Sequence, residues 1–123
     1  MIVVDSCGWL EYFSAGPLAE KYSPFLKDTT RVIVPTIVIY EVYKKIKREV
    51  GEEKALLAVA QMQSAVVAPF TNGVVLLAAD VSLAHNLPMA DAIVYATAKI
   101  ENVKLITSDE HFVGLDSVEY IIK

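Results

Sequence analysis

The 123-residue sequence predicts a single α/β domain, a three-layer α/β/α sandwich with a largely parallel central sheet. Short β-branched runs alternate along the chain with longer segments of helical periodicity, as parallel strands joined by crossover helices require. The chain is long enough for one hydrophobic core, and its 54% hydrophobic and 21% charged residues are typical of a folded domain. Because no linker or internal repeat divides it, we assign residues 1–123 to one domain.

The first part of the chain predicts two strands and two helices. The β-branched runs at residues 2–4 and 32–34 predict buried strands, and Pro35 stops the second of them. The segments at residues 7–14 and 18–27 predict short helices, separated by the turn-forming residues Ala-Gly-Pro. The chain therefore begins with a strand, two helices and a second strand.

The helix after Pro35 has the clearest periodicity. Thr36 is its predicted N-cap, and apolar side chains recur at intervals of three and four residues as far as Val50. Gly51 ends this helix, and a further helix over residues 52–65 follows.

The second half of the chain repeats the alternation. A weak strand at residues 66–68 precedes a helix that is capped by Thr71 or Asn72 and ends near residue 86. Pro88 is predicted in the first turn of the next helix, which ends near Ile100. The remaining predicted elements are a strand at residues 103–107, a turn or short helix at 110–113 and a last strand at 118–122.

Composition also bears on location. Residues 55–79 carry no formal charge, but polar and helix-breaking residues interrupt this run, so we interpret it as helix, strand and helix start rather than a membrane span. The N-terminus has no basic region, and Asp5 interrupts its apolar stretch, so no targeting segment is evident. The only cysteine, Cys7, forms no internal disulfide, which fits a reducing compartment. We expect a soluble, cytoplasmic protein without membrane association.

Four carboxylates stand at the ends of, or within, apolar or small-residue runs: Asp5, Glu41, Asp91 and Asp109. Asp5 and Asp109 each follow a predicted strand, while Glu41 and Asp91 lie in the first two turns of predicted helices. In a parallel sheet the carboxyl ends of the strands share one edge, so all four acids can converge there. Burying a lone carboxylate is costly unless it is paired, protonated or bound to a metal.

Each acid alone also has an ordinary structural interpretation. Asp5 and Asp109 can cap the helical segments that follow them, and Asp91 can interact with the dipole of its helix. Glu41 can form a surface ion pair with a lysine three or four residues later. Their common location makes a divalent-cation site the better explanation of the set.

Electrostatics points to a cation as well. Two carboxylates about 5 Å apart repel each other by roughly 3 kcal/mol at an effective dielectric constant near 20. A cluster of four therefore retains a proton or recruits a cation. Oxygen ligands suit Mg²⁺ or Mn²⁺, and no Cys or His grouping has the spacing of a zinc site. The net charge of −4 counts against a protein that coats nucleic acid, but less against an enzyme that meets phosphates through metal ions.

In their order, these motifs resemble the PIN domain, and within it the VapC-type toxins of prokaryotic toxin–antitoxin pairs. The matching features are Asp5, Glu41 in a Pro-Thr-led helix, the run Leu-Pro-Met-Ala-Asp-Ala-Ile-Val-Tyr-Ala-Thr-Ala around Asp91, and Thr-Ser-Asp-Glu-His-Phe around Asp109. The resemblance extends from Val3 to Phe112.

The resemblance implies a metal-dependent endoribonuclease that hydrolyses RNA phosphodiesters with a metal-activated water. It assigns catalysis and the binding of Mg²⁺ or Mn²⁺ to the four acids, with Asp109 preferred over the adjacent Glu110. It makes Ser6 and Thr107 supporting hydroxyls. It further implies a homodimer whose active-site groove is covered by a cognate antitoxin.

The remaining polar residues leave alternatives open. Lys44, Lys45 and Arg48 form either a solvated helix face or a ridge that contacts RNA phosphates on the side of Glu41. His111 lies two residues after Asp109, where a general acid–base role is conceivable. Cys7 is interpreted as a packed residue rather than a nucleophile, because no histidine is near it in sequence.

Three other functional classes compete with the nuclease. A catalytically silent PIN-fold interaction module is the main alternative, and the presence of all four acids favours the enzyme over it. A phospho-acceptor receiver would need an acidic neighbour for Asp5, and a haloacid-dehalogenase-like phosphatase would need an aspartate where Cys7 stands. The sequence meets neither requirement.

Overall fold

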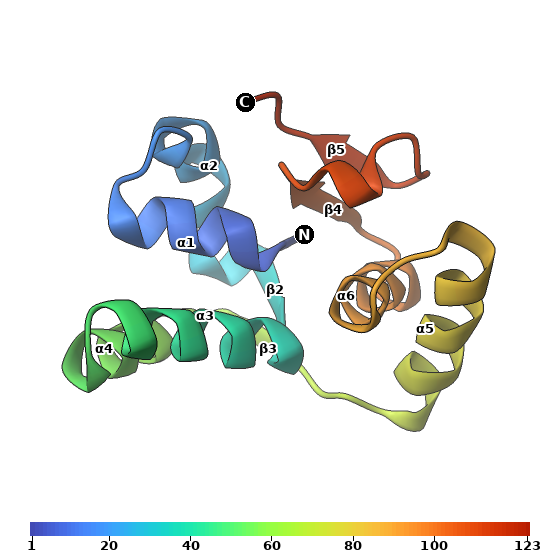
Figure 1. Cartoon of the computed structure of the whole chain (residues 1–123), viewed down its shortest axis with the longest axis horizontal. Helices are drawn as coiled ribbons and strands as arrows, with labels where there is room; N and C mark the ends of the chain where they lie inside the picture. Colours follow the sequence, from blue (N-terminus) through green and yellow to red (C-terminus); the bar gives the residue numbers. More distant parts are fainter.

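The computed structural model describes all residues from Met1 to Lys123 and contains one five-stranded sheet (Figure 1). The strand order is β3-β2-β1-β4-β5, and all four neighbouring pairs are parallel. The predicted α/β fold class is therefore confirmed, with a sheet that is parallel throughout. The strands are β1 (Ile2–Val4), β2 (Val32–Pro35), β3 (Val66–Ala68), β4 (Lys104–Thr107) and β5 (Val118–Tyr120).

All six predicted helices are present, and they pack largely in sequential pairs: α1 with α2, α3 with α4, and α5 with α6. Two 3₁₀ segments are added, η1 (Thr29–Arg31) and η2 (Glu110–Phe112). Of these, η2 matches the predicted short helix, whereas η1 was not predicted. The helices are α1 (Ser6–Ser14), α2 (Ala19–Leu26), α3 (Thr36–Glu49), α4 (Glu52–Met62), α5 (Asn72–His85) and α6 (Met89–Ile100).

Four predicted helix starts are wrong by one residue. Helix α1 begins at Ser6 instead of Cys7, α2 begins at Ala19 instead of Leu18, and the starts of α3 and α6 are misplaced beside a proline. Thr36 is the first residue of α3 rather than its N-cap, and Pro35 occupies the cap position without a side-chain hydrogen bond. Pro88 likewise precedes α6 instead of lying in its first turn. Both prolines have the extended conformation, with ψ of 141° and 157°, which ends the preceding segment before the helix begins. At α5, Thr71 is the cap and its hydroxyl accepts the N–H of Val74.

Helix α6 is the most deeply buried helix of the domain. Seven consecutive residues, Ala92 to Ala98, are buried, and the helix contacts β1, β4 and α3. Apolar side chains surround it on all sides, which fixes its position against the centre of the sheet. Its first turn, which contains Asp91, is therefore held at a defined place beside the strand ends.

The uncharged segment at residues 55–79 forms most of α4, then β3 and the start of α5, as predicted. No single helix in the structure is both long and apolar enough to cross a bilayer. The helices α5 and α6 reach that length and composition only as a pair, with a bend of 115° between them.

Candidate functional site

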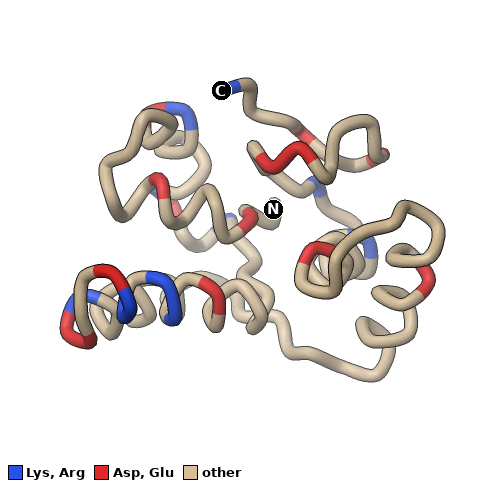
Figure 2. The backbone as a smooth tube through the Cα atoms, in the orientation of Figure 1, with Lys and Arg blue, Asp and Glu red and all other residues tan.

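The four predicted acids come from four separate elements near the carboxyl edge of the sheet. Asp5 directly follows β1, and Asp109 lies two residues after the end of β4. Glu41 lies in the second turn of α3 and Asp91 in the first turn of α6. Figure 2 shows acidic positions on these elements around the same central region. Consistent with this, the charges of the other acids contribute to the raised pKa values of Asp5 and Glu41.

Asp5 is the most buried of these carboxylates, with only 3% of its surface exposed. Oδ1 accepts the N–H of Ser6 at 2.8 Å, so Asp5 does cap α1, and Oδ2 accepts the Thr107 hydroxyl at 3.0 Å. Burial, aided by the negative charges of Asp91 and Asp109, raises the pKa of Asp5 to about 6. The two hydrogen bonds therefore do not fully compensate for burial, and the Asp5 carboxylate remains poorly stabilised as an anion.

Two small polar side chains, those of Thr107 and Cys7, contact the Asp5 carboxylate. The Thr107 hydroxyl, which donates to Asp5, also accepts the N–H of Asp109 at 3.0 Å and so ties two of the acids together. The Cys7 thiol lies 3.6 Å from Oδ2 of Asp5. Burial, together with the charge of Asp5, raises the pKa of Cys7, which keeps it a thiol. This supports the interpretation of Cys7 as a packed residue.

Glu41 is half-buried and makes no ion pair with Lys44 or Lys45. Lys44 instead lies over the Tyr40 ring, 5.5 Å from its centroid. Burial and the negative charge of Asp5 raise the pKa of Glu41 to about 7. The surface ion pair that sequence reasoning offered for Glu41 is therefore absent.

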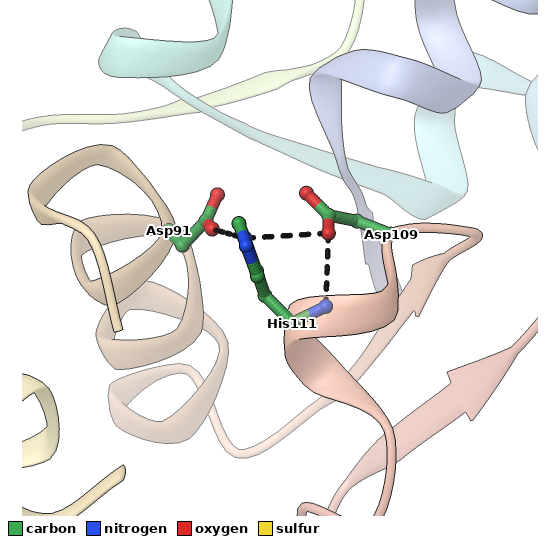
Figure 3. A group of neighbouring side chains, drawn as sticks. All are labelled: Asp91, Asp109 and His111. Atoms are coloured by element: carbon green, nitrogen blue, oxygen red, sulfur yellow. Dashed lines mark hydrogen bonds and ion pairs between the residues drawn. The ribbon is translucent and has the colours of Figure 1, made fainter. Parts of the chain in front are cut away.

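Asp91 has a partner that the sequence did not identify. His111 Nδ1 lies 2.7 Å from Oδ2 of Asp91 and 3.4 Å from Oδ1 of Asp109 (Figure 3). Asp109 also caps η2, because its Oδ1 accepts the N–H of His111 at 2.9 Å. One ligand atom from each of these three side chains lies within 4.8 Å of the other two, a grouping able to hold a metal ion. The only sequence signal for this was the two-residue spacing between Asp109 and His111.

The site carries more negative charge than its surroundings neutralise. No lysine or arginine forms an ion pair with any of the four acids, and only His111, which carries a charge when protonated, is paired with them. The hydrogen bond to Asp91 raises the pKa of His111, while burial raises the pKa of Asp91. Carboxylate oxygens grouped without a permanent cation fit the ligand preference of a hard divalent ion. The residues present therefore fit Mg²⁺ or Mn²⁺.

Comparisons with known proteins bear on the family and on the fold of this chain. A family model described as PIN domain matches residues 2–117. No curated protein sequence matches the chain. A toxin–antitoxin complex from Klebsiella pneumoniae is similar at a TM-score of 0.80 and 19% identity, over 98% of this chain and 100% of that one.

Two further solved structures share the fold. VapBC2 from Rickettsia felis, bound to a DNA fragment from their promoter, is similar at a TM-score of 0.78 and 14% identity, over 98% of both chains. Mycobacterium tuberculosis VapC20, described as a sarcin–ricin loop cleaving toxin, is similar at a TM-score of 0.73 and 19% identity, over 85% of both chains. At these identities the likeness establishes the fold.

Proposed function

This chain belongs to the PIN domain family, and we propose that it is a metal-dependent endoribonuclease, the toxin of a VapBC-type toxin–antitoxin pair. The observation that carries the proposal is the buried, hydrogen-bonded Asp5 carboxylate within a cluster of acids that no lysine or arginine neutralises. Such a cluster is unfavourable in isolation and becomes favourable when a divalent cation binds it. The similar fold of VapC20, described as a sarcin–ricin loop cleaving toxin, supports the choice of RNA as substrate.

In this proposal Asp5, Glu41, Asp91 and Asp109 are the catalytic acids and hold Mg²⁺ or Mn²⁺. When bound, such a cation activates water and stabilises negative charge on a phosphodiester. Thr107 orients Asp5 through its hydroxyl and Asp109 through its backbone. Ser6 supports Asp5 through its backbone N–H, and its side chain lowers the pKa of Glu41 against the effect of burial.

The basic residues of α3 are proposed to contact RNA phosphates. Lys44, Lys45 and Arg48 line a hollow of about 300 Å³ together with Glu41, so cationic side chains lie directly beside one of the catalytic acids. Figure 2 shows the basic positions along α3 and α4 in blue. Alanine at all three positions should reduce the salt-dependence slope of single-stranded RNA binding by about 2. An unchanged slope would mean that these residues form a solvated helix face and do not contact RNA phosphates.

A protein partner is part of the proposal. A groove of about 610 Å³ runs between α1, α3 and α4 and is lined by 13 residues, 7 of them hydrophobic. We propose that a cognate antitoxin covers the active-site groove and places a segment in this adjoining groove, which shares Leu10 and Lys45 with the hollow that contains Glu41. We further propose a homodimer in the cytoplasm, supported by exposed apolar side chains on α5 such as Leu76 and Leu83. A monomeric mass by light scattering at micromolar concentration would refute the dimer.

The experiment that tests the enzymatic function is cleavage of a mixed RNA pool by the purified, partner-free protein. We expect cleavage with Mg²⁺ or Mn²⁺, loss of cleavage with EDTA and recovery when excess metal is added back. The physical reason is that the four acids supply ligands but no cation of their own. Inactivity of the folded protein with every metal and RNA would favour the silent interaction module instead.

A further inference from the structure

We propose that His111 is a ligand, through Nδ1, of the cation held by Asp91 and Asp109, and that this nitrogen makes the site favour Mn²⁺ over Mg²⁺. The inference rests on the proposed function and adds a residue outside the four acids. It starts from the position of the imidazole, whose Nδ1 lies close to carboxylate oxygens of both Asp91 and Asp109 (Figure 3).

The distances match a shared coordination sphere. Neighbouring donors of an octahedral ion with bonds of about 2.1 Å are about 3.0 Å apart. His111 Nδ1 lies 2.7 Å from Asp91 Oδ2 and 3.4 Å from Asp109 Oδ1, on either side of that value. The three ligand atoms therefore need only small movements to face one common ion.

The backbone of η2 holds His111 in this position. Asp109 Oδ1 accepts the His111 N–H at 2.9 Å, so the carboxylate and the imidazole are fixed relative to each other by the same turn. The His111 side chain is 57% exposed, and no hydrogen bond in the structure engages Nε2. The ring can therefore present Nδ1 to the ion while Nε2–H remains in contact with water.

The expected metal preference follows from ligand chemistry. Mg²⁺ prefers oxygen donors, whereas an imidazole is a better ligand for first-row transition ions. An Asp-Asp-His grouping should therefore increase affinity for Mn²⁺ more than affinity for Mg²⁺. The competing explanation is that His111 merely neutralises Asp91 and is displaced when a cation binds. Only coordination places its nitrogen in contact with the metal.

The test is pulsed electron paramagnetic resonance of Mn²⁺ bound to the full chain. The sequence contains only two histidines, so His85, at the end of α5, provides a matched control. We expect nitrogen modulation of the Mn²⁺ signal in the wild type and in His85→Ala, and its absence in His111→Ala and His111→Gln. By calorimetry, His111→Ala should lose at least about tenfold in Mn²⁺ affinity and less than about threefold in Mg²⁺ affinity.

The possible outcomes separate this inference from the proposed function. Bound Mn²⁺ without nitrogen modulation in the wild type would overturn the role of His111, while EDTA-sensitive RNA cleavage in the same preparation would leave the nuclease intact. Equal loss of Mn²⁺ and Mg²⁺ affinity in both His111 variants would also overturn the claimed preference. Thermal unfolding of each variant establishes that it is folded.

Discussion

Asp91→Asn is expected to reduce RNA cleavage by at least about a thousandfold, because metal-ion catalysis contributes several kcal/mol to the transition state. The substitution keeps the shape of the side chain and removes its negative charge. Burial already raises the pKa of Asp91, so the neutral side chain should not destabilise the fold. Single-turnover cleavage of one labelled RNA with saturating metal measures the loss.

Asp80→Asn is the matched control for this substitution. Asp80 is an exposed aspartate on α5 that forms no ion pair, so its replacement should leave the cleavage rate within about twofold. If Asp91→Asn retained more than a tenth of the wild-type rate, Asp91 would not be a ligand in the reaction. A parallel fall in both variants would point to an effect of net charge on RNA binding instead.

Asp5→Asn is expected to abolish cleavage and at the same time to stabilise the metal-free protein. In the folded state the pKa of Asp5 is about 6, above the ordinary value of 3.8. The folded protein therefore keeps a proton that the unfolded chain has already released, and stability falls as the pH rises from about 4 through 6. The difference between a pKa of about 6 and the ordinary 3.8 corresponds to about 3 kcal/mol, which the uncharged asparagine should recover above pH 7.

Urea unfolding in EDTA at pH 5 and pH 8 measures this effect. The wild type should lose more stability between pH 5 and pH 8 than Asp5→Asn does. The pH dependence that remains in Asp5→Asn is expected from Glu41 and Asp91, whose pKa values are also raised. Asp28→Asn is the matched control, because Asp28 also caps a helical segment but is exposed and has a lowered pKa. Its replacement should not stabilise the protein. An Asp5→Asn protein less stable than the wild type at pH 8 would contradict the account.

Excess Mn²⁺ should reverse the order of stability. A ligand at about 1,000 times its dissociation constant stabilises the state that binds it by about 4.1 kcal/mol, more than the roughly 3 kcal/mol by which Asp5→Asn is favoured in EDTA. The wild type should gain this amount at pH 8, and Asp5→Asn should gain little. The acid cluster would then destabilise the metal-free protein and stabilise the metal-bound protein.

The sequence was enough to predict the features that depend on local residue patterns. It also predicted those that follow because the carboxyl ends of parallel strands share one edge of the sheet. Asp5 and Asp109 follow buried strands, so their place at the carboxyl edge followed from the parallel arrangement of the sheet. The helix starts at Pro35 and Pro88 were each misplaced by one residue, because a proline suits both the cap and the first turn.

Contacts between distant elements could not be predicted in this way. His111 meets Asp91 only because the buried α6 is docked beside η2, and the two residues are 20 positions apart. The contact of Cys7 with Thr107 spans 100 positions and depends on the pairing of β1 with β4. The raised pKa of Asp5 likewise depends on burial that neighbouring residues in the sequence do not reveal.

If the acids at the sheet edge form a divalent-cation site, anomalous X-ray scattering from a Mn²⁺-soaked crystal should locate the ion there. We expect an anomalous peak in contact with the carboxylates of Asp91 and Asp109, on the side of the site that faces Asp5. The same peak should be missing in crystals of Asp91→Asn. A fully soaked wild-type crystal with no peak among these acids, or with Mn²⁺ bound only elsewhere on the surface, would contradict this divalent-cation site.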